Sequence, residues 1–452
     1  MIDALDPLGN AIRVQRPDSV AALAGFVDGL LGYRRCILDV LAAAEHDHSL
    51  IVQACAAALW MFSESPAGPP KARTHLDLAR RAALPATDRE QGFAQAVQHW
   101  VAGDTAAAFA QHERQAGAHP RDLVSLKLGQ YHAFNAGDSP GMLRLAWLAR
   151  GAAGDQACWH AMAAFGFEQC HRLHEAERHA RQALALTAHE PWAEHALAHV
   201  MLTDGRFAEG RDFLLRASPP WRGLTSFMRS HNFWHLALFQ LELGDDAAAL
   251  ALYDQDVWGI DKSYSQDQVG AVSLLARLEW AGVDVGDRWQ DLADHLLPRV
   301  SDQVQPFLDL QYLYGLARAG RPEADSLLAN LQRHAAEAPG AKPRTRQAWH
   351  GVAVPAALGL CLHARGLAQP AQARWAEAAD ALGRAMPQLA RIGGSHAQRD
   401  LFEQLWIDAL QRAGDAAAVL NHLQPRANAA PQSRRLARRV RSVSVGLGLP
   451  QD

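Results

Sequence analysis

The sequence predicts an all-α protein built from repeated pairs of helices. Ala and Leu are abundant, and few segments show the alternating Val, Ile and Thr that is typical of strands. A turn pattern also recurs along the chain at a fixed spacing. With 452 residues, of which 49% are hydrophobic, the chain is long enough for one extended array or for two or three ordinary domains.

The recurring turn has a helix on each side. Its positions lie 34 residues apart at Gly103, Gly137, His171 and Gly205, and Gly244 follows 39 residues later. A 34-residue period of helix, short turn and helix is the tetratricopeptide signature, in which small residues at the turn let paired helices pack closely. We therefore expect a right-handed α-solenoid of about nine to ten helix pairs. The sequence leaves open whether it curls around a central cavity.

The helical pattern divides the chain in order. Residues 1–18 are expected to be an irregular lead-in, because Pro7, Gly9 and Pro17 interrupt helices, and Ser19 is expected to cap the first helix. A Pro/Gly-rich connection at 65–74 precedes the repeats, and 337–346 is expected to be an exposed loop. The other parts are an N-terminal helical pair over 19–64, tetratricopeptide-like repeats over 75–268, divergent helical repeats over 269–432 and a basic tail over 433–452.

The turns of the divergent part are expected where glycines recur. They fall in WAGVDVGDRW, ARAGRPEAD, HARGLAQPAQ and RAGDAAAVL. We interpret the basic tail as a solvated or frayed terminal helix; an RNA- or lipid-binding tail is the alternative.

Composition excludes several classes of function. A net charge of −4 does not demand nucleic acid or a membrane surface as a partner. The five cysteines form no C-x-x-C pair, which argues against a disulfide framework and fits a reducing cytosol. The N-terminus lacks the features of a signal peptide, and no uninterrupted apolar run reaches membrane-spanning length. We expect a soluble, cytoplasmic protein.

Three blocks of sequence resemble a known family. HALAHV, HNFWHLALFQLELGDDAAALALYD and IGGSHAQRDLFEQLWIDAL are similar, in letters and in order, to blocks of tetratricopeptide repeat protein 38 and its bacterial relatives. The resemblance extends from about residue 20 to residue 425. It implies a curved all-helical array in the cytosol, and it implies no particular reaction.

Two histidine pairs carry the clearest functional signal. His195 and His199 form one H-x-x-x-H pair, and His231 and His235 form the next. Residues four apart share one face of a helix, so each pair can converge on one ligand, and neighbouring first helices can bring all four rings together. Three interpretations stay open: core or groove histidines, a polar binding or acid–base pocket, and a metal site.

A metal is not expected at these pairs. No H-E-x-x-H sequence occurs, and no carboxylate shares the face of either pair, since Glu194 should point elsewhere. Other side chains are expected on the concave face because repeat positions 2, 5, 6, 9, 12 and 13 face inward. These positions predict ligand contacts from Lys127, Tyr131, Glu168, Trp192 and Trp234, with Glu90, Cys158 and Phe165 also on that face.

A second candidate site follows two glycines. Gly393 and Gly394 free the backbone, Ser395 can cap the next helix, and His396, Arg399 and Asp400 lie on its first turns. Exposed helix N-terminal amides beside an arginine form an anion site, although Arg399 and Asp400 can equally pair with neighbouring helices. Two further histidine groups, 46–48 and 171–179, are expected at the surface, and Cys158 is expected to pack.

Two classes of function remain open. The first is a binding protein that holds a small polar ligand or a peptide in a His/Trp-lined concave pocket. The second is an enzyme, a hydrolase or lyase with or without a metal, that acts on a small polar or anionic molecule at the same histidines. In that case His195, His199, His231, His235, His396, Arg399 and Asp400 are the candidate catalytic residues. No nucleotide or serine-hydrolase motif occurs, the cofactor is unknown, and a homodimer remains open.

Overall fold

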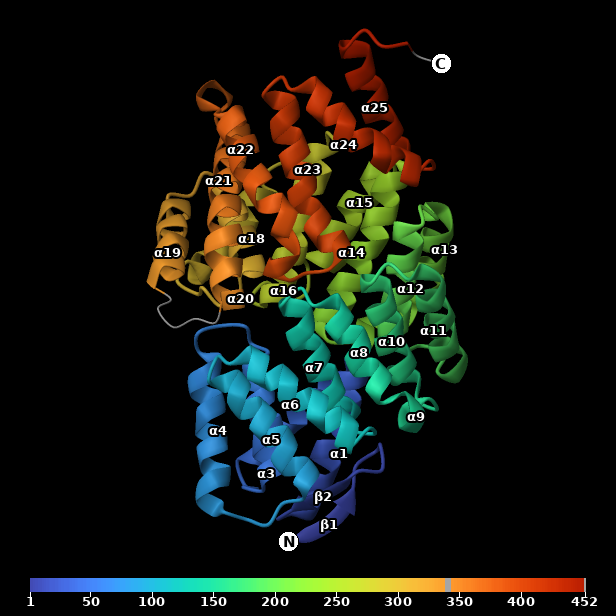
Figure 1. Ribbon diagram of the computed structural model, residues 1–452, viewed down its shortest axis with the longest axis vertical. Coiled ribbons are helices and arrows are strands. Elements are labelled where there is room, and N and C mark those ends of the chain that lie inside the picture. Colours follow the sequence, from blue (N-terminus) through green and yellow to red (C-terminus); the bar gives the residue numbers. More distant parts are fainter. Residues whose placement is uncertain (338–342, 451–452) are drawn as a thin grey trace. The chain divides into compact units, whose positions relative to one another are not determined.

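The computed structural model describes residues 1–337 and 343–450, and the chain divides into two compact units. Unit 1 comprises residues 1–197 and 219–228, and unit 2 comprises residues 198–218 and 229–452. Two of the three dividing lines fall inside helices, namely α12 (Pro191–Thr203) and α14 (Ser226–Leu243). Across the described ranges the structure is helical apart from one N-terminal hairpin, which confirms the predicted all-α class (Figure 1).

Unit 1 opens with two short antiparallel strands, followed by helices. The strands are β1 (Ile2–Leu5) and β2 (Ala11–Val14). The remaining elements of unit 1 are α1 (Pro17–Gly32), η1 (Arg35–Leu38), α2 (Asp39–Ala44), α3 (Leu50–Met61), α4 (Gly68–Ala82), α5 (Asp88–Val101), α6 (Thr105–Ala118), α7 (Leu123–Asn135), α8 (Ser139–Leu148), α9 (Arg150–Ala153), α10 (Ala157–Gln169), α11 (Leu173–Leu186) and η2 (Pro219–Gly223).

The regular elements described in unit 2 are all helices. Besides the shared helices, its elements are α13 (Phe207–Ala217), α15 (Asp246–Leu252), η3 (Tyr253–Val257), α16 (Ser265–Trp280), α17 (Arg288–Leu296), η4 (Leu297–Arg299), α18 (Pro306–Arg318), α19 (Glu323–Glu337), α20 (Pro343–Arg346), η5 (Gln347–Ala353), α21 (Val354–Ala368), η6 (Pro370–Gln372), α22 (Trp375–Ala385), η7 (Met386–Ile392), α23 (His396–Arg412), α24 (Ala416–Ala429) and α25 (Arg434–Gly446).

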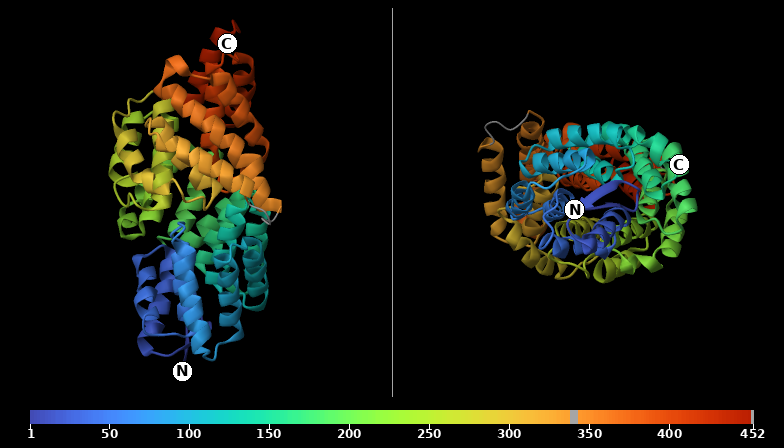
Figure 2. Two further views of the ribbon diagram at one scale, coloured as in Figure 1. Left: turned by 90° about the vertical axis from the view of Figure 1, so that its left-hand side faces the viewer. Right: turned by 90° about the horizontal axis from the view of Figure 1, so that it is seen from below.

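The predicted turn positions are confirmed by the backbone. Each has a positive φ, the left-handed conformation that ends one helix before the next begins: Gly103, Gly137, His171, Gly205 and Gly244. A new helix starts two residues after each of them. His171 therefore occupies the position of the missing glycine, with a φ of 55°. Consecutive helices then pack on one another as pairs, for example α5 on α6, α10 on α11 and α21 on α22 (Figure 2).

An aspartate after the glycine explains why the second helix of a pair begins where it does. Asp104, Asp138, Asp245 and Asp415 are N-caps, and each side chain accepts a hydrogen bond from the backbone N–H three residues later. The Gly-Asp dipeptide thus ends one helix and starts the next.

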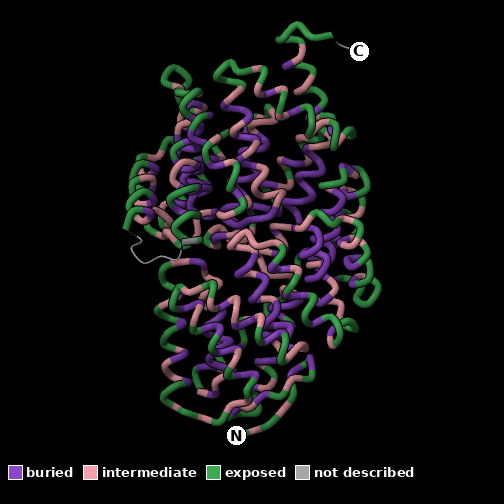
Figure 3. Tube along the Cα trace, in the orientation of Figure 1, coloured by how far each residue is buried: buried purple, intermediate pink, exposed green. Residues whose placement is uncertain are grey.

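The two helices of a pair differ in burial. The first helices α10, α16 and α18 are buried along most of their length, whereas the second helices α11, α17 and α19 bury only one stripe. Figure 3 shows this contrast as mostly purple inner segments and green outer ones. The first helices therefore carry the core of each unit, and polar side chains on them are the ones that need an explanation.

The prediction for residues 1–18 was wrong, because this segment contains the hairpin. Ile12 and Val14 of β2 are buried in the hydrophobic core of unit 1, which stabilises strands too short to be recognised from alternation. Pro17 does not break a helix but is the first residue of α1, a position at which the backbone N–H forms no hydrogen bond within the helix. Because α1 begins before Ser19, Ser19 is not its cap.

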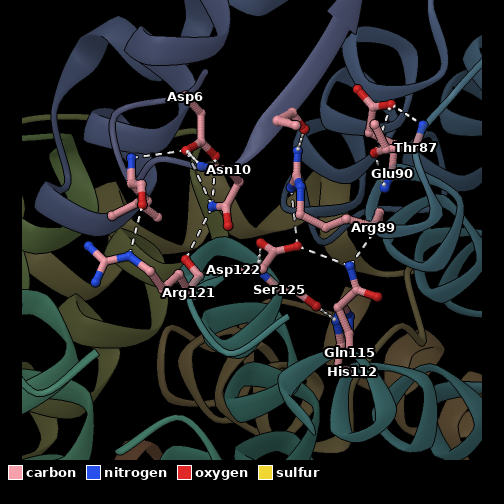
Figure 4. A network of polar contacts seen from close by, with 12 residues as sticks. Asp6, Asn10, Thr87, Arg89, Glu90, His112, Gln115, Arg121, Asp122 and Ser125 are labelled. Carbon is pink, nitrogen blue, oxygen red and sulfur yellow. Dashed lines mark hydrogen bonds and ion pairs between the residues drawn. The ribbon is translucent and has the colours of Figure 1, made fainter. Parts of the chain in front are cut away.

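A buried polar network joins this hairpin to the first helix pairs (Figure 4). Arg89 on α5 forms an ion pair with Asp122 at 3.2 Å, and both side chains are buried. The same guanidinium donates to the carbonyl of Ala11 on β2 at 3.2 Å. Gln115 on α6 donates to the Arg89 carbonyl at 2.7 Å and to Asp122 at 3.1 Å. Each buried charge in this network therefore has a partner.

Several expected boundaries also differ. The segment expected as one helix from residue 19 breaks at Tyr33, which has a φ of 56°. The Pro/Gly-rich connection at 65–74 is mostly helical, because its prolines take the first positions of α4. Gly366 marks no turn but lies inside α21, under the Trp375 ring. Of the expected loop at 337–346, residues 338–342 lie outside the described residues.

Within the described residues, one helical stretch is long and apolar enough to cross a membrane, although the sequence contains no uninterrupted apolar run of that length. It covers Arg344–Ala368, with a mean hydropathy of 1.4 in its most apolar window. About half of that window, 56%, is buried inside the protein. Its main part, α21, packs against α18, α19 and α22, as the core helix of a unit does.

Candidate functional site

Three histidines of unit 2 form a buried cluster on α12 and α14. His199 and His235 are about 1% and 0% exposed, and His231 is partly buried. The ring centroids of His199 and His235 lie 4.4 Å apart, and those of His231 and His235 lie 4.9 Å apart. Each ring offers a nitrogen within 4.8 Å of the others. The pairing inferred from the H-x-x-x-H spacing therefore places His231 and His235 beside His199.

His195 lies one turn before His199 on α12. The line between the units passes after Leu197, so His195 belongs to unit 1. Its ring stacks on Trp192 with a centroid distance of 4.4 Å and lies 5.2 Å from the Phe165 ring. The helix fixes its place relative to His199, on the same face.

Burial keeps the imidazoles of His231 and His235 neutral. It lowers the pKa of His231 to about 3 and the pKa of His235 well below its ordinary value. The neighbouring His199 and, for His235, the positive charge of Arg277 lower the pKa further. Neutral imidazoles offer lone pairs, so the cluster can accept hydrogen bonds or bind a metal ion.

Arg277 on α16 connects the histidine helix α14 to the second candidate site. Its guanidinium lies 5.4 Å from the Trp234 ring centroid and donates to the carbonyl of Ala397 on α23 at 2.8 Å. It also lies 3.6 Å from the Asp400 carboxylate. Arg277 was not among the predicted site residues. Its position among the apolar residues of a helix buried on all sides is the one feature that could have marked it as a functional residue.

Asp400 is held as a carboxylate in this arrangement. Burial alone would raise its pKa, but the positive charges of Arg426 and Arg277 outweigh burial, and its pKa lies below the ordinary value. Arg426 also forms an ion pair with Asp400 and with Glu403. This is the pairing with neighbouring helices that the sequence had left open for Asp400.

Ser395 caps α23 in a capping box with Gln398, as expected. The Arg399 guanidinium donates to the carbonyls of Gly394 and Gly393, and it lies 3.3 Å from the His396 ring nitrogen. These bonds hold the Arg399 side chain against the backbone of Gly393 and Gly394. Arg277, rather than Arg399, is therefore the arginine whose charge acts on His235.

A second group of predicted residues meets inside unit 1, around a lysine. The Lys127 ammonium lies 3.8 Å from the Trp192 ring centroid and 4.8 Å from that of Tyr33, and the two rings stack at 5.4 Å. Burial lowers the pKa of Lys127 and raises the pKa of the neighbouring Glu190. Burial also raises the pKa of Cys158, to about 12, so this thiol is not a nucleophile at neutral pH.

Other residues predicted on the concave face have structural partners. Tyr131 donates its hydroxyl to Glu64 at 2.9 Å. Glu168 accepts a hydrogen bond from Gln169 at 2.5 Å and is fully buried. Glu90 closes the capping box of α5 and accepts from the Arg13 backbone at 2.8 Å. The last contact was not expected, because it depends on the N-terminal hairpin.

Glu194 is not a member of the histidine cluster. Its carboxylate accepts a hydrogen bond from the Trp221 indole at 2.7 Å, and burial raises its pKa to about 8. Two surface assignments hold only in part: His46, His171 and His174 are exposed, but each group also contains a buried residue. His179 is buried, with its ring 2.9 Å from the His160 ring nitrogen, and burial lowers its pKa to about 4. Asp47 is also buried, where it accepts backbone hydrogen bonds from Gln15 and two other residues.

The basic tail is neither frayed nor fully solvated. Leu436 and Val443 of α25 are buried in a small core with α23 and α24. Arg435 and Arg439 lie over the Trp280 ring, at 4.6 and 4.0 Å from its centroid. A groove of about 720 Å³ lies between α25 and the end of α14, and another of about 590 Å³ lies between α5 and α6. Neither groove is lined by a residue of the histidine cluster.

The helix pairs, their turn register and the buried first helices define the class of protein: this chain is a tetratricopeptide-like helical-repeat protein. A comparison with models of protein families finds no match. Among solved structures, the crystal structure of the P58(IPK) TPR domain is similar at 12% identity, over 72% of this chain and 99% of that chain, with a TM-score of 0.22. The class assignment rests on the helices of this chain.

Proposed function

We propose that this chain is a cytoplasmic binding protein, a bacterial member of the tetratricopeptide repeat protein 38 family, that holds a small polar ligand at the histidine cluster. The blocks that resemble the family support this assignment, because HALAHV contains His195 and His199 and HNFWH contains His231 and His235. The burial of the cluster favours a small ligand over a peptide, which would need an open groove.

The observation that carries the proposal is an unpaired amide on α14, the helix that carries His231 and His235. Asn232, between His231 and His235 on α14, is 1% exposed, and within the described chain neither its amide nitrogen nor its oxygen has a hydrogen-bond partner. The same holds for the indole nitrogen of Trp234, which is also 1% exposed. Buried polar groups are nearly always paired, because an unpaired one costs about 1–3 kcal/mol. A bound polar ligand at the cluster would supply the partners that the Asn232 amide lacks.

Charge supports a ligand that is polar or anionic. Arg277 stays protonated at neutral pH, although burial lowers its pKa to about 10, and its charge acts on His235. Asp400 balances that charge from the far side, at 3.6 Å. A cationic organic ligand would be repelled by the charge of Arg277, and the histidine cluster has no carboxylate to offset that repulsion.

Asn232→Leu tests the proposal because it separates stability from binding. Removing an unsatisfied buried amide is expected to raise the stability of the ligand-free protein, on the order of 1 kcal/mol, while it abolishes binding. Thermal unfolding gives the first quantity. Thermal shifts with a panel of small carboxylates, phosphates and neutral polar molecules give the second, and at least one probe should stabilise the wild type and not the variant.

Gln268→Leu is the matched control in the same unit. Gln268 is equally buried, but its side chain donates to the carbonyls of Lys262 and His295 at 2.9 Å each and accepts from Arg299. Its replacement should lower stability, because it leaves those partners unpaired. If Asn232→Leu destabilises the protein as Gln268→Leu does, the amide is structural and the proposed ligand site is lost.

A second candidate function is an enzyme at the same cluster. Three histidines that can meet at one point are the donor set of catalytic zinc sites, which leave a fourth position for water or substrate. A hydrolase or lyase acting on a small polar or anionic molecule would use that position. Turnover of such a substrate, lost in His235→Ala, would favour this candidate over binding alone.

A further inference from the structure

We infer that His199, His231 and His235 together bind one divalent transition-metal ion. The inference deepens the proposed function, and it rests on that function in placing the polar ligand at the open coordination position of the ion. The sequence had argued against a metal because no carboxylate accompanies the histidine pairs. In the structure three histidine nitrogens lie close together. Three such donors can hold a metal ion without a carboxylate.

The distances suit a common ion. The donor nitrogens lie within 4.8 Å of one another, while two nitrogens bound tetrahedrally to one zinc ion at about 2.0–2.1 Å stand about 3.3–3.4 Å apart. The imidazole side chains must therefore rotate inward when the ion binds. The rings also avoid parallel stacking with one another, with interplanar angles of 60° between His199 and His235 and 84° between His231 and His235. Crossed rings can direct their nitrogens at a common centre.

The cluster is held by rigid elements. His231 and His235 lie one turn apart on α14, and His199 lies on α12, with alanines packed at zero exposure on both helices, including Ala198 and Ala237. Donors fixed on packed helices lose little freedom when an ion binds. His195 lies one turn earlier on α12, and the inference does not need it.

The donor type selects the ion. Imidazole nitrogens bind zinc, copper, nickel and cobalt, whereas calcium and magnesium require oxygen donors. The cluster contains neither a thiolate nor a carboxylate. Arg277 opposes a cation, but its charge is balanced by Asp400, so the site is not excluded by its surroundings. An ion with three neutral ligands keeps its full positive charge, and it would therefore attract an anionic or polar group at its open position.

Cobalt provides the direct test. The full chain is stripped of metal with a chelator, and one equivalent of Co²⁺ is added while the visible absorption of four-coordinate cobalt is recorded. We expect a band of unit stoichiometry that zinc removes by competition. The band should be lost in His199→Ala, His231→Ala and His235→Ala. It should be retained in His350→Ala, which removes an exposed histidine on η5.

Folding is checked by circular dichroism, and Gln variants at the same positions are used where an alanine variant does not fold. A wild type that shows no band at one equivalent would overturn the inference, as would a band that survives all three cluster variants. The failure of the two proposals is distinguishable, because the cobalt test uses the metal alone. If cobalt does not bind, but a ligand still stabilises the wild type and not Asn232→Leu, the metal proposal is wrong and the ligand site stands.

Discussion

Replacing Arg89 by alanine is expected to lower the free energy of unfolding of unit 1 by about 3–5 kcal/mol. The substitution leaves the Asp122 carboxylate, 2% exposed, without its ion-pair partner and removes a hydrogen bond to Ala11 on the hairpin. An uncompensated buried charge accounts for the large effect. Urea unfolding followed by circular dichroism measures it, and hydrogen exchange of α5 to α7 locates it.

Arg13→Ala is the control for this prediction. Arg13 lies on the same hairpin and forms an ion pair with Asp3, but the two side chains are 39% and 76% exposed. Exposed pairs contribute about 0–1 kcal/mol, so little change is expected. A loss for Arg89→Ala no greater than that for Arg13→Ala would show that the network in Figure 4 does not stabilise unit 1.

Gly359→Ala is expected to destabilise unit 2 by about 1–3 kcal/mol. A Cβ at this position of α21 would lie 2.6 Å from Leu382 Cγ, 2.8 Å from the Leu382 backbone nitrogen and 3.0 Å from the Ala378 carbonyl oxygen. Because two of these atoms belong to the backbone of α22, the helices of the pair must move apart. Thermal unfolding of the full chain measures the effect.

The same substitution at Gly270 should have the opposite sign. Gly270 lies inside α16, and a Cβ there would meet no atom within 4 Å. Alanine is the better helix former by about 0.8–1.0 kcal/mol, so Gly270→Ala should stabilise unit 2. Equal effects at the two glycines would contradict the close approach of α21 and α22.

Much of the fold could be predicted because its signals are local. The Gly-Asp turn at 103–104 and its repeats carry both the end of one helix and the cap of the next, so the period shows in the sequence even where His171 replaces glycine. The hairpin could not be predicted in this way. Its two strands are four residues each and are stabilised by distant contacts, such as the hydrogen bond between Arg89 and Ala11.

The candidate site was predicted in part for a similar reason. The spacing of His231 and His235 fixes their shared face, and the repeat register places α12 beside α14. Arg277 belongs to a later helix, and its approach to Trp234 depends on how α16 packs between α14 and α23. The burial of His179 also depends on packing, since its contact with His160 joins two helices.

The histidines of α12 and α14 are proposed to form the binding centre of this protein. An anomalous difference map at the zinc absorption edge, from crystals of the full chain grown with one equivalent of zinc, tests this proposal. We expect one strong peak within about 2.0–2.1 Å of ring nitrogens of His199, His231 and His235. Zinc bound only at surface histidines, with these three rings free of density between them, would contradict it.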